Sequence, residues 1–340
     1  MGYRRWGAAL VAGSMLLAAC GGGDDDKAAP KATTTTTEAP TTTAAAAAVH
    51  PLTGLPGEPK QRPALILKLD NAPKARMQAG LQNADVVIEE AVEGGVTRFM
   101  VVYHSNDTDE VGPVRSARST DILIGTALNK PLFAYSGANA VFEKQLREST
   151  LINVGPNAKG GAYFRKSGRP APYNLWGRFS QLYEGAQGGP PPALFEYRAE
   201  GEAAAGEPAN QVNFEFRGRI VTAVEWRWDA ASGTYRRKTD GKDHTDANGT
   251  PVQPKNVVVA FTEYFNTGLV DASGEPVPEG KIVGEGEAWV FTDGKVIKGK
   301  WSKPAAEQVT TYTDANGQPI KLTPGQTWLE LPKPGSARIS

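Results

Sequence analysis

Short aliphatic runs alternate with amphipathic stretches in the first part of the chain after residue 50. Four runs rich in aliphatic and β-branched residues predict strands, at residues 64–67, 85–88, 99–103 and 132–135. Three other stretches predict helices, near residues 116–128, 138–148 and 175–186. Because the order is mixed rather than strictly repeating, it predicts an α/β (α+β) fold in which helices pack on a mixed sheet.

The pattern changes at the Gly-Gly-Pro-Pro-Pro run of residues 188–192, through which neither a helix nor a central strand continues. Apolar and polar residues then alternate, notably in residues 212–216 and 224–228 and in part in residues 288–291. Asp293-Gly294 between two apolar pairs predicts a hairpin. We therefore expect an N-terminal α/β domain of residues 50–190 and a mostly β, hairpin-rich C-terminal domain of residues 191–340.

A six-residue pattern, Asp-Ala-(Asn/Ser)-Gly-x-Pro, occurs three times, beginning at Asp246, Asp271 and Asp314. An Asp that accepts hydrogen bonds from its own backbone, followed by a Gly with positive φ, closes a tight turn. Calcium loops are the alternative, since Asp and Asn oxygens suit that ion. Each copy has a single carboxylate and lacks a closing Glu, so we predict turns and assign no metal site.

The first twenty residues have the pattern of a bacterial lipoprotein signal. Arg4 and Arg5 precede a short apolar run, and Leu17-Ala18-Ala19-Cys20 is typical of a cleavage site that ends in a lipidated cysteine. An uncleaved N-terminal helix is the alternative, but the run is short for a bilayer span. We expect removal of residues 1–19 and a palmitate-bearing Cys20 that holds the protein on the outer side of the cell membrane.

Composition excludes several further classes of function. Residues 20–49 comprise this cysteine and a Thr/Ala/Pro-rich tether without aromatic residues, which we expect to be disordered. Cys20 is the only cysteine, so the mature chain has no disulfide and no thiol nucleophile. Removing residues 1–19 leaves 35 basic and 37 acidic side chains, a balance that argues against nucleic-acid binding by bulk charge.

No familiar catalytic motif is present in the sequence. Its three histidines lack a second histidine at metal-ligand spacing, and there is no Gly-x-Ser-x-Gly elbow, Ser-x-x-Lys pair or phosphate-binding loop. We therefore assign no catalytic residue and no cofactor.

Polar motifs instead follow several of the predicted strands, where loops of α/β sheets line ligand crevices. Arg115 and Arg118 stand three residues apart near a predicted helix start, so they would share one helix face. Guanidinium groups bind carboxylate or phosphate bidentately. The candidate ligand-binding residues are Arg98, Arg115, Arg118, Asp70, Asn71, Glu89, Ser136, Asn139 and Asn174.

The same arginines have a structural alternative. Arg115 or Arg118 can pair with Glu89, Glu90 or Asp121 and so bridge helix to sheet. Because the dipole disfavours a cation at a helix N-terminus, each needs an acidic partner, in the chain or in a ligand. The sequence leaves both interpretations open.

Several motifs in matching order resemble those of the YerB-like lipoproteins, whose domains are catalogued as a domain of unknown function, DUF3048. They are Pro51-Leu52-Thr53-Gly54, residues 93–99, residues 112–118, Pro172-Tyr173-Asn174-Leu175, residues 299–301 and residues 322–330. The resemblance implies a lipid-anchored, extracytoplasmic protein with a mixed α/β body in two parts and no established activity. Family members often have His where this chain has Tyr173, which favours packing or hydrogen bonding over acid–base catalysis there.

Three functions follow as hypotheses. The first is a non-enzymatic protein that binds an envelope component or an envelope protein through an arginine-lined crevice. The second is a cell-wall glycan hydrolase or transferase with two carboxylates about 5–10 Å apart, drawn from Asp70, Glu89, Glu90 and Glu93. The third is a protein-contact module with an exposed patch of Trp226, Trp228 and Trp289.

Overall fold

The computed structural model describes residues 48–271 and 273–340. The predicted signal peptide, Cys20 and nearly all of the predicted tether lie outside the described residues. Within the described ranges no helix has the length and apolar character needed to cross a membrane.

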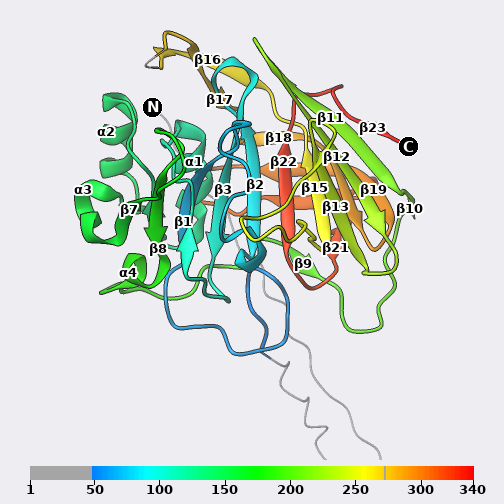
Figure 1. Ribbon diagram of the computed structural model, residues 1–340. Helices are drawn as coiled ribbons and strands as arrows, with labels where there is room; N and C mark the ends of the chain where they lie inside the picture. Colours follow the sequence, from blue (N-terminus) through cyan, green and yellow to red (C-terminus); the bar gives the residue numbers. More distant parts are fainter. Residues whose placement is uncertain (1–47, 272) are drawn as a thin grey trace, which may run out of the picture. The chain divides into compact units, whose positions relative to one another are not determined.

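A large sheet of eleven strands takes members from both halves of the sequence (Figure 1). The first half contributes β1 (Leu65–Asp70), β2 (Val86–Ala91), β3 (Thr97–Tyr103), β5 (Leu132–Ala134) and β6 (Ile152–Asn153). The second half contributes β10 (Glu207–Pro208), β15 (Asn256–Ala260), β18 (Gly284–Thr292), β19 (Lys295–Lys303), β20 (Thr311–Asp314) and β22 (Thr327–Leu331). The strand order is β10-β19-β18-β15-β22-β2-β3-β1-β5-β6, and β20 pairs with β19.

Strand β22 joins the two sets of strands. It runs parallel to β2 on one side and parallel to β15 on the other, with Thr327 opposite both Val86 and Asn256. The large sheet is therefore continuous across residue 190, where the sequence predicts a domain boundary. A domain boundary near residue 190 therefore remains a prediction from the sequence.

A second, antiparallel sheet packs on one face of the large sheet. Its members are β11 (Gln211–Arg217), β12 (Val221–Asp229), β13 (Thr234–Thr239), β14 (Lys242–Asp243) and β23 (Arg338–Ile339), in the order β14-β13-β12-β11-β23. The predicted alternation is present, because every second residue of β11 is buried. Phe214 and Trp226 from this sheet share a core with Phe99 and Trp328 of the large sheet.

Helices cover part of the opposite face. α1 (Ser119–Gly125) continues into η3 (Thr126–Leu128), and α2 (Ala140–Glu148) follows. Buried Ile122 and Leu146 from these helices pack with Ile66 and Val102 of the sheet. The predictions near residues 116–128 and 138–148 are thereby confirmed.

The remaining elements are short. They are η1 (Leu81–Asn83), η2 (Glu93–Gly95), α3 (Pro156–Lys159), η4 (Gly160–Ala162), α4 (Phe179–Tyr183), the sheet of β4 (Glu110–Val111), β8 (Leu175–Arg178) and β7 (Tyr163–Arg165), the pair β9 (Glu196–Tyr197) and β21 (Lys321–Leu322), and the hairpin β16 (Tyr264–Val270) with β17 (Pro276–Gly280). The helix predicted over residues 175–186 is wrong in its first part. Residues 175–177 pair with β7, so the helix begins only at Phe179.

The three repeated patterns form turns, as predicted. Asp246, Asp271 and Asp314 each use Oδ1 to accept hydrogen bonds from the backbone amides two and four residues later, at 2.8–3.0 Å. Asp293 and Gly294 both have positive φ and connect β18 to β19, which confirms the predicted hairpin. The structure as a whole confirms a mixed α/β fold with a β-rich C-terminal half.

Candidate functional site

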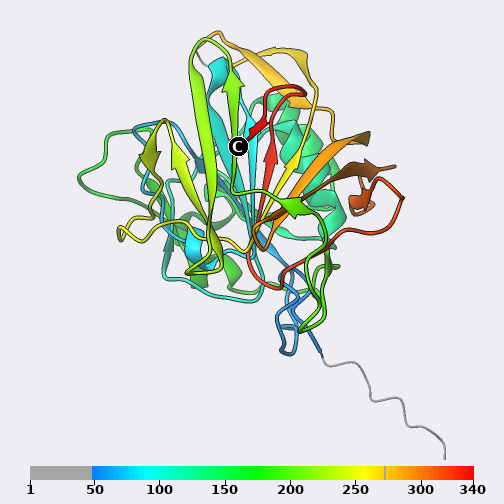
Figure 2. The same cartoon turned by 90° about the vertical axis from the view of Figure 1, so that its right-hand side faces the viewer.

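The sequence motifs that contain Asp70, Glu93, Arg115 and Tyr173 converge on one cavity of about 130 Å³. Residues from the N-terminal half line one side, namely Asp70, Ala72, Val92, Glu93, Val96, Arg98, Arg115 and Tyr173. The other side comes from the C-terminal half, as Arg219, Asp271, Ser273 and Glu275. We call this cavity the arginine crevice. It lies beside the turn of the β16–β17 hairpin, which projects at the top of the view in Figure 2.

Strand register sets the position of the central arginine. Arg98, at the start of β3, stands opposite Asp70 of β1 and opposite Glu90 of β2. The segment before α1 is fixed beside them, because the Arg115 amide donates to Lys68 O at 2.8 Å. The predicted common helix face of Arg115 and Arg118 is wrong. Helix α1 begins at Ser119, so Arg118 is its N-cap and Arg115 precedes it in irregular backbone.

The arginines do have partners within the chain, but not the predicted ones. Arg115 Nε lies 2.8 Å from Asp70 Oδ2, and Arg118 Nε donates to Glu93 Oε1 at 2.5 Å. Burial alone would raise the pKa of Glu93. The hydrogen bond and charge of Arg118, aided by Arg98, outweigh that effect and hold the pKa below its ordinary value.

Arg98 is buried and has an unused hydrogen-bond donor. Its Nη1 donates to Ser116 O at 3.0 Å, whereas Nη2 lies 3.7 Å from Glu93 Oε2. Its buried Nε has no hydrogen-bond partner among the described residues. Burial, reinforced by the charge of Arg118, lowers the pKa of Arg98 to about 10, so it stays charged at neutral pH. A buried guanidinium with a spare donor can donate a hydrogen bond to an anionic group of a ligand.

The crevice as a whole is electrically mixed. Three arginines and four carboxylates line it, and Arg118 behind Glu93 makes the numbers equal. It therefore does not attract anions by net charge. Recognition would instead depend on individual donors held in fixed positions, above all those of Arg98 and Arg115.

The second sheet contributes to the crevice through a contact between two turns. Ile220, in the β11–β12 turn, donates its amide to Gly94 O at 2.8 Å, and Thr222 Oγ1 donates to Gly95 O at 3.0 Å. Arg219 is thereby held at the rim, where its Nε lies 2.8 Å from Glu275 Oε1. A larger cavity of about 300 Å³ adjoins the crevice and shares Arg219 and Glu275 with it.

Gly95→Ala is expected to destabilise the protein more than Gly94→Ala. Both glycines have positive φ, at +67° for Gly94 and +86° for Gly95, so both substitutions carry a backbone penalty of about 1–2 kcal/mol. Only at Gly95 would the new Cβ overlap with backbone atoms of Ile220 and Gly218. Chemical denaturation should show a loss larger by at least about 1 kcal/mol for Gly95→Ala. Equal losses would contradict the tight contact between the turns.

Six of the nine predicted site residues do not line the crevice. Asn71 and Glu89 point into a buried network, described below, and Ser136 lines a separate small cavity. Asn139 caps α2, since its Oδ1 accepts from the amides of residues 141 and 142. Asn174 Oδ1 accepts from Arg165 Nη1 at 2.8 Å. The crevice therefore unites Asp70, Arg98 and Arg115, with Arg118 directly behind Glu93.

Sequence reasoning missed the contribution of the C-terminal half. Arg219, Ser273 and Glu275 gave no signal beyond the turn predicted at Asp271, because their approach depends on how the two sheets pack. The sequence indicates Tyr173 only as a position of a family motif. In the structure it lines the crevice, and the Arg115 guanidinium lies 5.9 Å from its ring centre.

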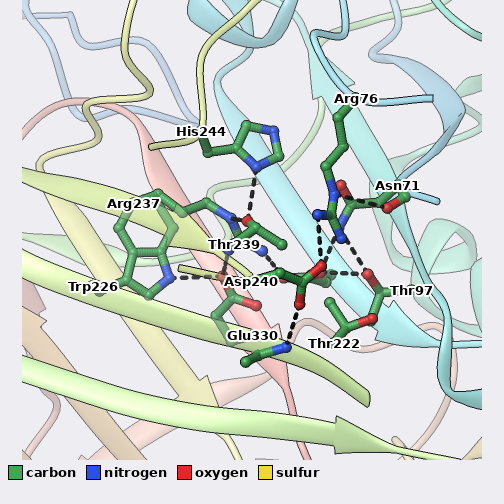
Figure 3. Close-up of polar contacts among 12 residues, drawn as sticks. Asn71, Arg76, Thr97, Thr222, Trp226, Arg237, Thr239, Asp240, His244 and Glu330 are labelled. Carbon is green, nitrogen blue, oxygen red and sulfur yellow. Dashed lines mark hydrogen bonds and ion pairs between the residues drawn. The ribbon is translucent and has the colours of Figure 1, made fainter. Parts of the chain in front are cut away.

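A buried ion network lies between the two sheets (Figure 3). Arg237 donates to Glu89 Oε2 at 2.5 Å and to Glu330 Oε1 at 2.7 Å, and Trp226 donates to Glu330 Oε1 at 2.9 Å. Glu89 and Glu330 are cross-strand neighbours on β2 and β22. Burial, and then the charge of Glu89, raise the pKa of Glu330 well above its ordinary value. Both glutamates and Arg237 are buried, so this network fixes the packing of the sheets.

A second buried cluster occupies the helix-covered face of β2. Lys68 Nζ donates to Glu90 Oε1 and, at 2.7 Å, to Asp121 Oδ1. All three side chains are almost completely buried. Asp121 Oδ2 also accepts from the Arg118 amide at 2.7 Å, which ties this cluster to the crevice. Glu90 and Asp121 thus pair with Lys68 rather than with an arginine side chain, contrary to the internal pairing that the sequence suggested.

The tryptophans predicted to form an exposed patch do not do so. Trp226 is fully buried between the sheets, against Trp328. Trp228 and Trp289 are half-buried, and each packs against another aromatic ring. The patch is absent because Trp226 lies on the inner face of its sheet.

The two halves of the sequence each match a domain of one known protein family. Residues 52–190 match the N-terminal domain, and residues 212–329 the C-terminal domain, of the DUF3048 proteins, both described as being of unknown function. The chain belongs to this family. It is similar to the YerB protein of Bacillus subtilis (strain 168), provisionally named a lipoprotein, with 29% identity over 307 residues that cover 85% of this chain and 88% of YerB. The crystal structure of YerB from Bacillus subtilis matches with a TM-score of 0.74 and 25% identity, covering 86% of this chain and 99% of that chain.

Proposed function

We propose that this protein is an extracytoplasmic lipoprotein, anchored through Cys20, that binds an anionic group of an envelope component or envelope protein in the arginine crevice. The observation behind this proposal is Arg98, a buried arginine in the crevice wall with a spare donor and only a long ion pair to Glu93. The lipoprotein signal in the sequence and the provisional naming of the similar YerB as a lipoprotein support the anchor.

The donors favour a carboxylate or phosphate as the recognised group. Arg98 offers Nε, and Arg115 pairs with Asp70 through Nε alone among the described contacts. Planar guanidinium groups bind such oxyanions through two parallel hydrogen bonds, which gives geometric selectivity as well as affinity.

The adjoining cavity supports a ligand larger than a single ion. Its wall includes Tyr264, Phe265 and Pro278, so it offers apolar and aromatic surface next to Arg219. An anionic group in the crevice, joined to an uncharged portion beyond Arg219, would use both cavities. Such a ligand fits an envelope component or a segment of an envelope protein.

The alternative of a glycan hydrolase or transferase has less support. Each of its four candidate carboxylates has an internal cation partner, namely Arg115 for Asp70, Arg237 for Glu89, Lys68 for Glu90 and Arg118 for Glu93. Glu89 and Glu90 are also buried on opposite faces of β2. A pair of carboxylates across an open cleft, which that chemistry needs, is therefore not available from these two.

A ligand screen tests the binding proposal. Soluble anionic cell-wall fragments and inorganic phosphate are added to the full chain, and the thermal midpoint is followed. A bound ligand in excess should raise the midpoint by several degrees, since about 1 kcal/mol corresponds to roughly 2–4 °C at this size. Arg115→Ala and Arg98→Lys should abolish the rise, the latter because a lysine lacks the planar fork.

The matched control is Arg227→Ala, which removes an exposed arginine of β12 outside the crevice. It should leave the ligand-induced rise unchanged. A rise that survives Arg115→Ala and Arg98→Lys, or the lack of any rise across the screen, would contradict binding in the crevice.

A further inference from the structure

A separate cavity lies between α1–η3 and strands β19 and β20, on the helix-covered face of the large sheet. It shares no lining residue with the arginine crevice. Side chains of β2 and β22, such as Ile88 and Leu329, line one part, and Ala127, Trp301 and Tyr312 line another. Its volume is about 60 Å³. The lining is almost entirely apolar, so the cavity has little to hold water in place.

Lys303 is the sole charged residue in this lining. It stands at the end of β19 and is only 3% exposed. Its Nζ donates to Gln308 O in the β19–β20 turn, and no carboxylate of the described residues lies within 4.0 Å of it. Burial lowers the pKa of Lys303 to about 8, partly offset by the charge of Glu307. It is therefore an ammonium group at neutral pH, with two of its three donors free among the described contacts.

We infer that this cavity binds the chain of an anionic single-chain amphiphile, whose carboxylate or phosphate head pairs with Lys303. The apolar lining receives the hydrocarbon, and the Lys303 ammonium group supplies the opposite charge. A buried cation without an anion is costly, so a ligand that brings a negative charge gains more than an uncharged one of the same length.

The size of the cavity selects an unbranched chain. An engineered apolar cavity of roughly 150 Å³ takes up benzene. This cavity is smaller, at about 60 Å³, so a ring does not fit without rearrangement, whereas the few methylene groups next to the head of a linear chain can enter. Trp301 and Tyr312 in the lining would contact these methylene groups.

Lys303 also has a purely structural explanation, which the experiment must separate from ligand binding. Its hydrogen bond to Gln308 O holds the β19–β20 turn over the cavity. If this were its whole role, the protein would not distinguish a charged amphiphile from a neutral one. Comparing an anionic amphiphile, decanoate, with a neutral one of the same length, decanol, therefore separates ligand binding from a purely structural role of Lys303.

The test uses the full chain in nanodiscs, with empty nanodiscs as the reference for partitioning into lipid. Bromine-labelled decanoate, which quenches tryptophan on contact, should give saturable quenching that arises from Trp301. Decanol should compete at least roughly tenfold more weakly than decanoate, as expected for loss of one charge-assisted hydrogen bond. Lys303→Met should remove this preference, and Ala127→Leu, which fills the cavity, should weaken both ligands.

The matched control is Lys300→Met, which removes an exposed lysine from the same strand and should change nothing. Trp301→Phe should abolish the quenching while calorimetry still detects binding, which keeps the test valid if Ala127→Leu unfolds. Equal competition by decanoate and decanol in the native chain, unchanged preference in Lys303→Met, or quenching that persists in Trp301→Phe would each overturn the inference.

Discussion

Replacing Arg237 with methionine is expected to lower the free energy of unfolding by about 3–5 kcal/mol, the cost of removing one partner from a buried ion pair. Methionine can occupy the apolar surroundings, since the Arg237 guanidinium lies 5.0 Å from the Trp328 ring centre and 5.2 Å from that of Trp226. The loss would come from Glu89 and Glu330, which would remain buried without a cation. Urea denaturation of native and variant chains measures it.

Two comparisons isolate the electrostatic part of this loss. Arg236→Met removes the neighbouring arginine, whose side chain is 39% exposed and pairs with Asp229, and should cost no more than about 1 kcal/mol. Adding Glu89→Gln to Arg237→Met removes the glutamate charge that has lost its cation, so the double variant should regain part of the stability. A double-mutant cycle measures this gain as the coupling energy between residues 89 and 237. Similar losses for the Arg236 and Arg237 variants would contradict a stabilising role for the buried network.

The second large effect concerns pH and Glu90. Burial, followed by repulsion from Asp121, raises the pKa of Glu90 to about 7 against the attraction of Lys68. A carboxyl group with a higher pKa in the folded state binds its proton more tightly there. Its contribution to stability is therefore complete below pH 4.5 and disappears as the pH rises to about 7. A shift of this size corresponds to roughly 3 kcal/mol.

Glu90→Gln should remove that decline, because glutamine does not titrate. Burial lowers the pKa of both His104 and His244, which makes stability fall below about pH 6.5 and so opposes the Glu90 effect. The informative quantity is therefore the difference between native and variant free energies of unfolding at pH 5, 6, 7 and 8. The difference should change by about 2.5 kcal/mol between pH 5 and pH 8, because the full effect is reached only below pH 4.5. Parallel profiles, like those expected for the exposed Glu148→Gln control, would refute the assignment.

Much of the fold could be predicted from residue pattern alone. The alternation in residues 212–216, the aliphatic run of residues 99–103 and the Asp293-Gly294 turn each depend on local sequence, and each forms the expected element. Residues 175–178 form a strand rather than the predicted helix, because the strand depends on pairing with β7 and β4, which lie elsewhere in the sequence.

The candidate site was harder to predict because both faces of β2 are covered. Glu89 faces the second sheet and Glu90 faces the helices, so two successive charged residues are buried. Sequence pattern assigns such residues to solvent or to a ligand crevice, since nothing local reveals their partners. Arg237 and Lys68, which neutralise them, lie 148 and 22 residues away along the chain. In contrast, Arg98 and Arg115 could be identified, because their motifs follow strand ends in the N-terminal half.

The central position of β22 has a consequence for how the protein would reach its folded state if it is exported, as proposed above. Strands β2 and β15 each leave one edge open until residues 327–331 arrive between them. A chain that emerges N-terminus first would therefore expose the unpaired edge of β2 for most of its translocation and that of β15 for the last part, a state prone to pairing with other chains. Folding would have to wait for nearly the whole chain and would be slow, because the decisive contacts join residues more than two hundred positions apart. We expect such a protein to depend on protection by folding factors at the membrane surface.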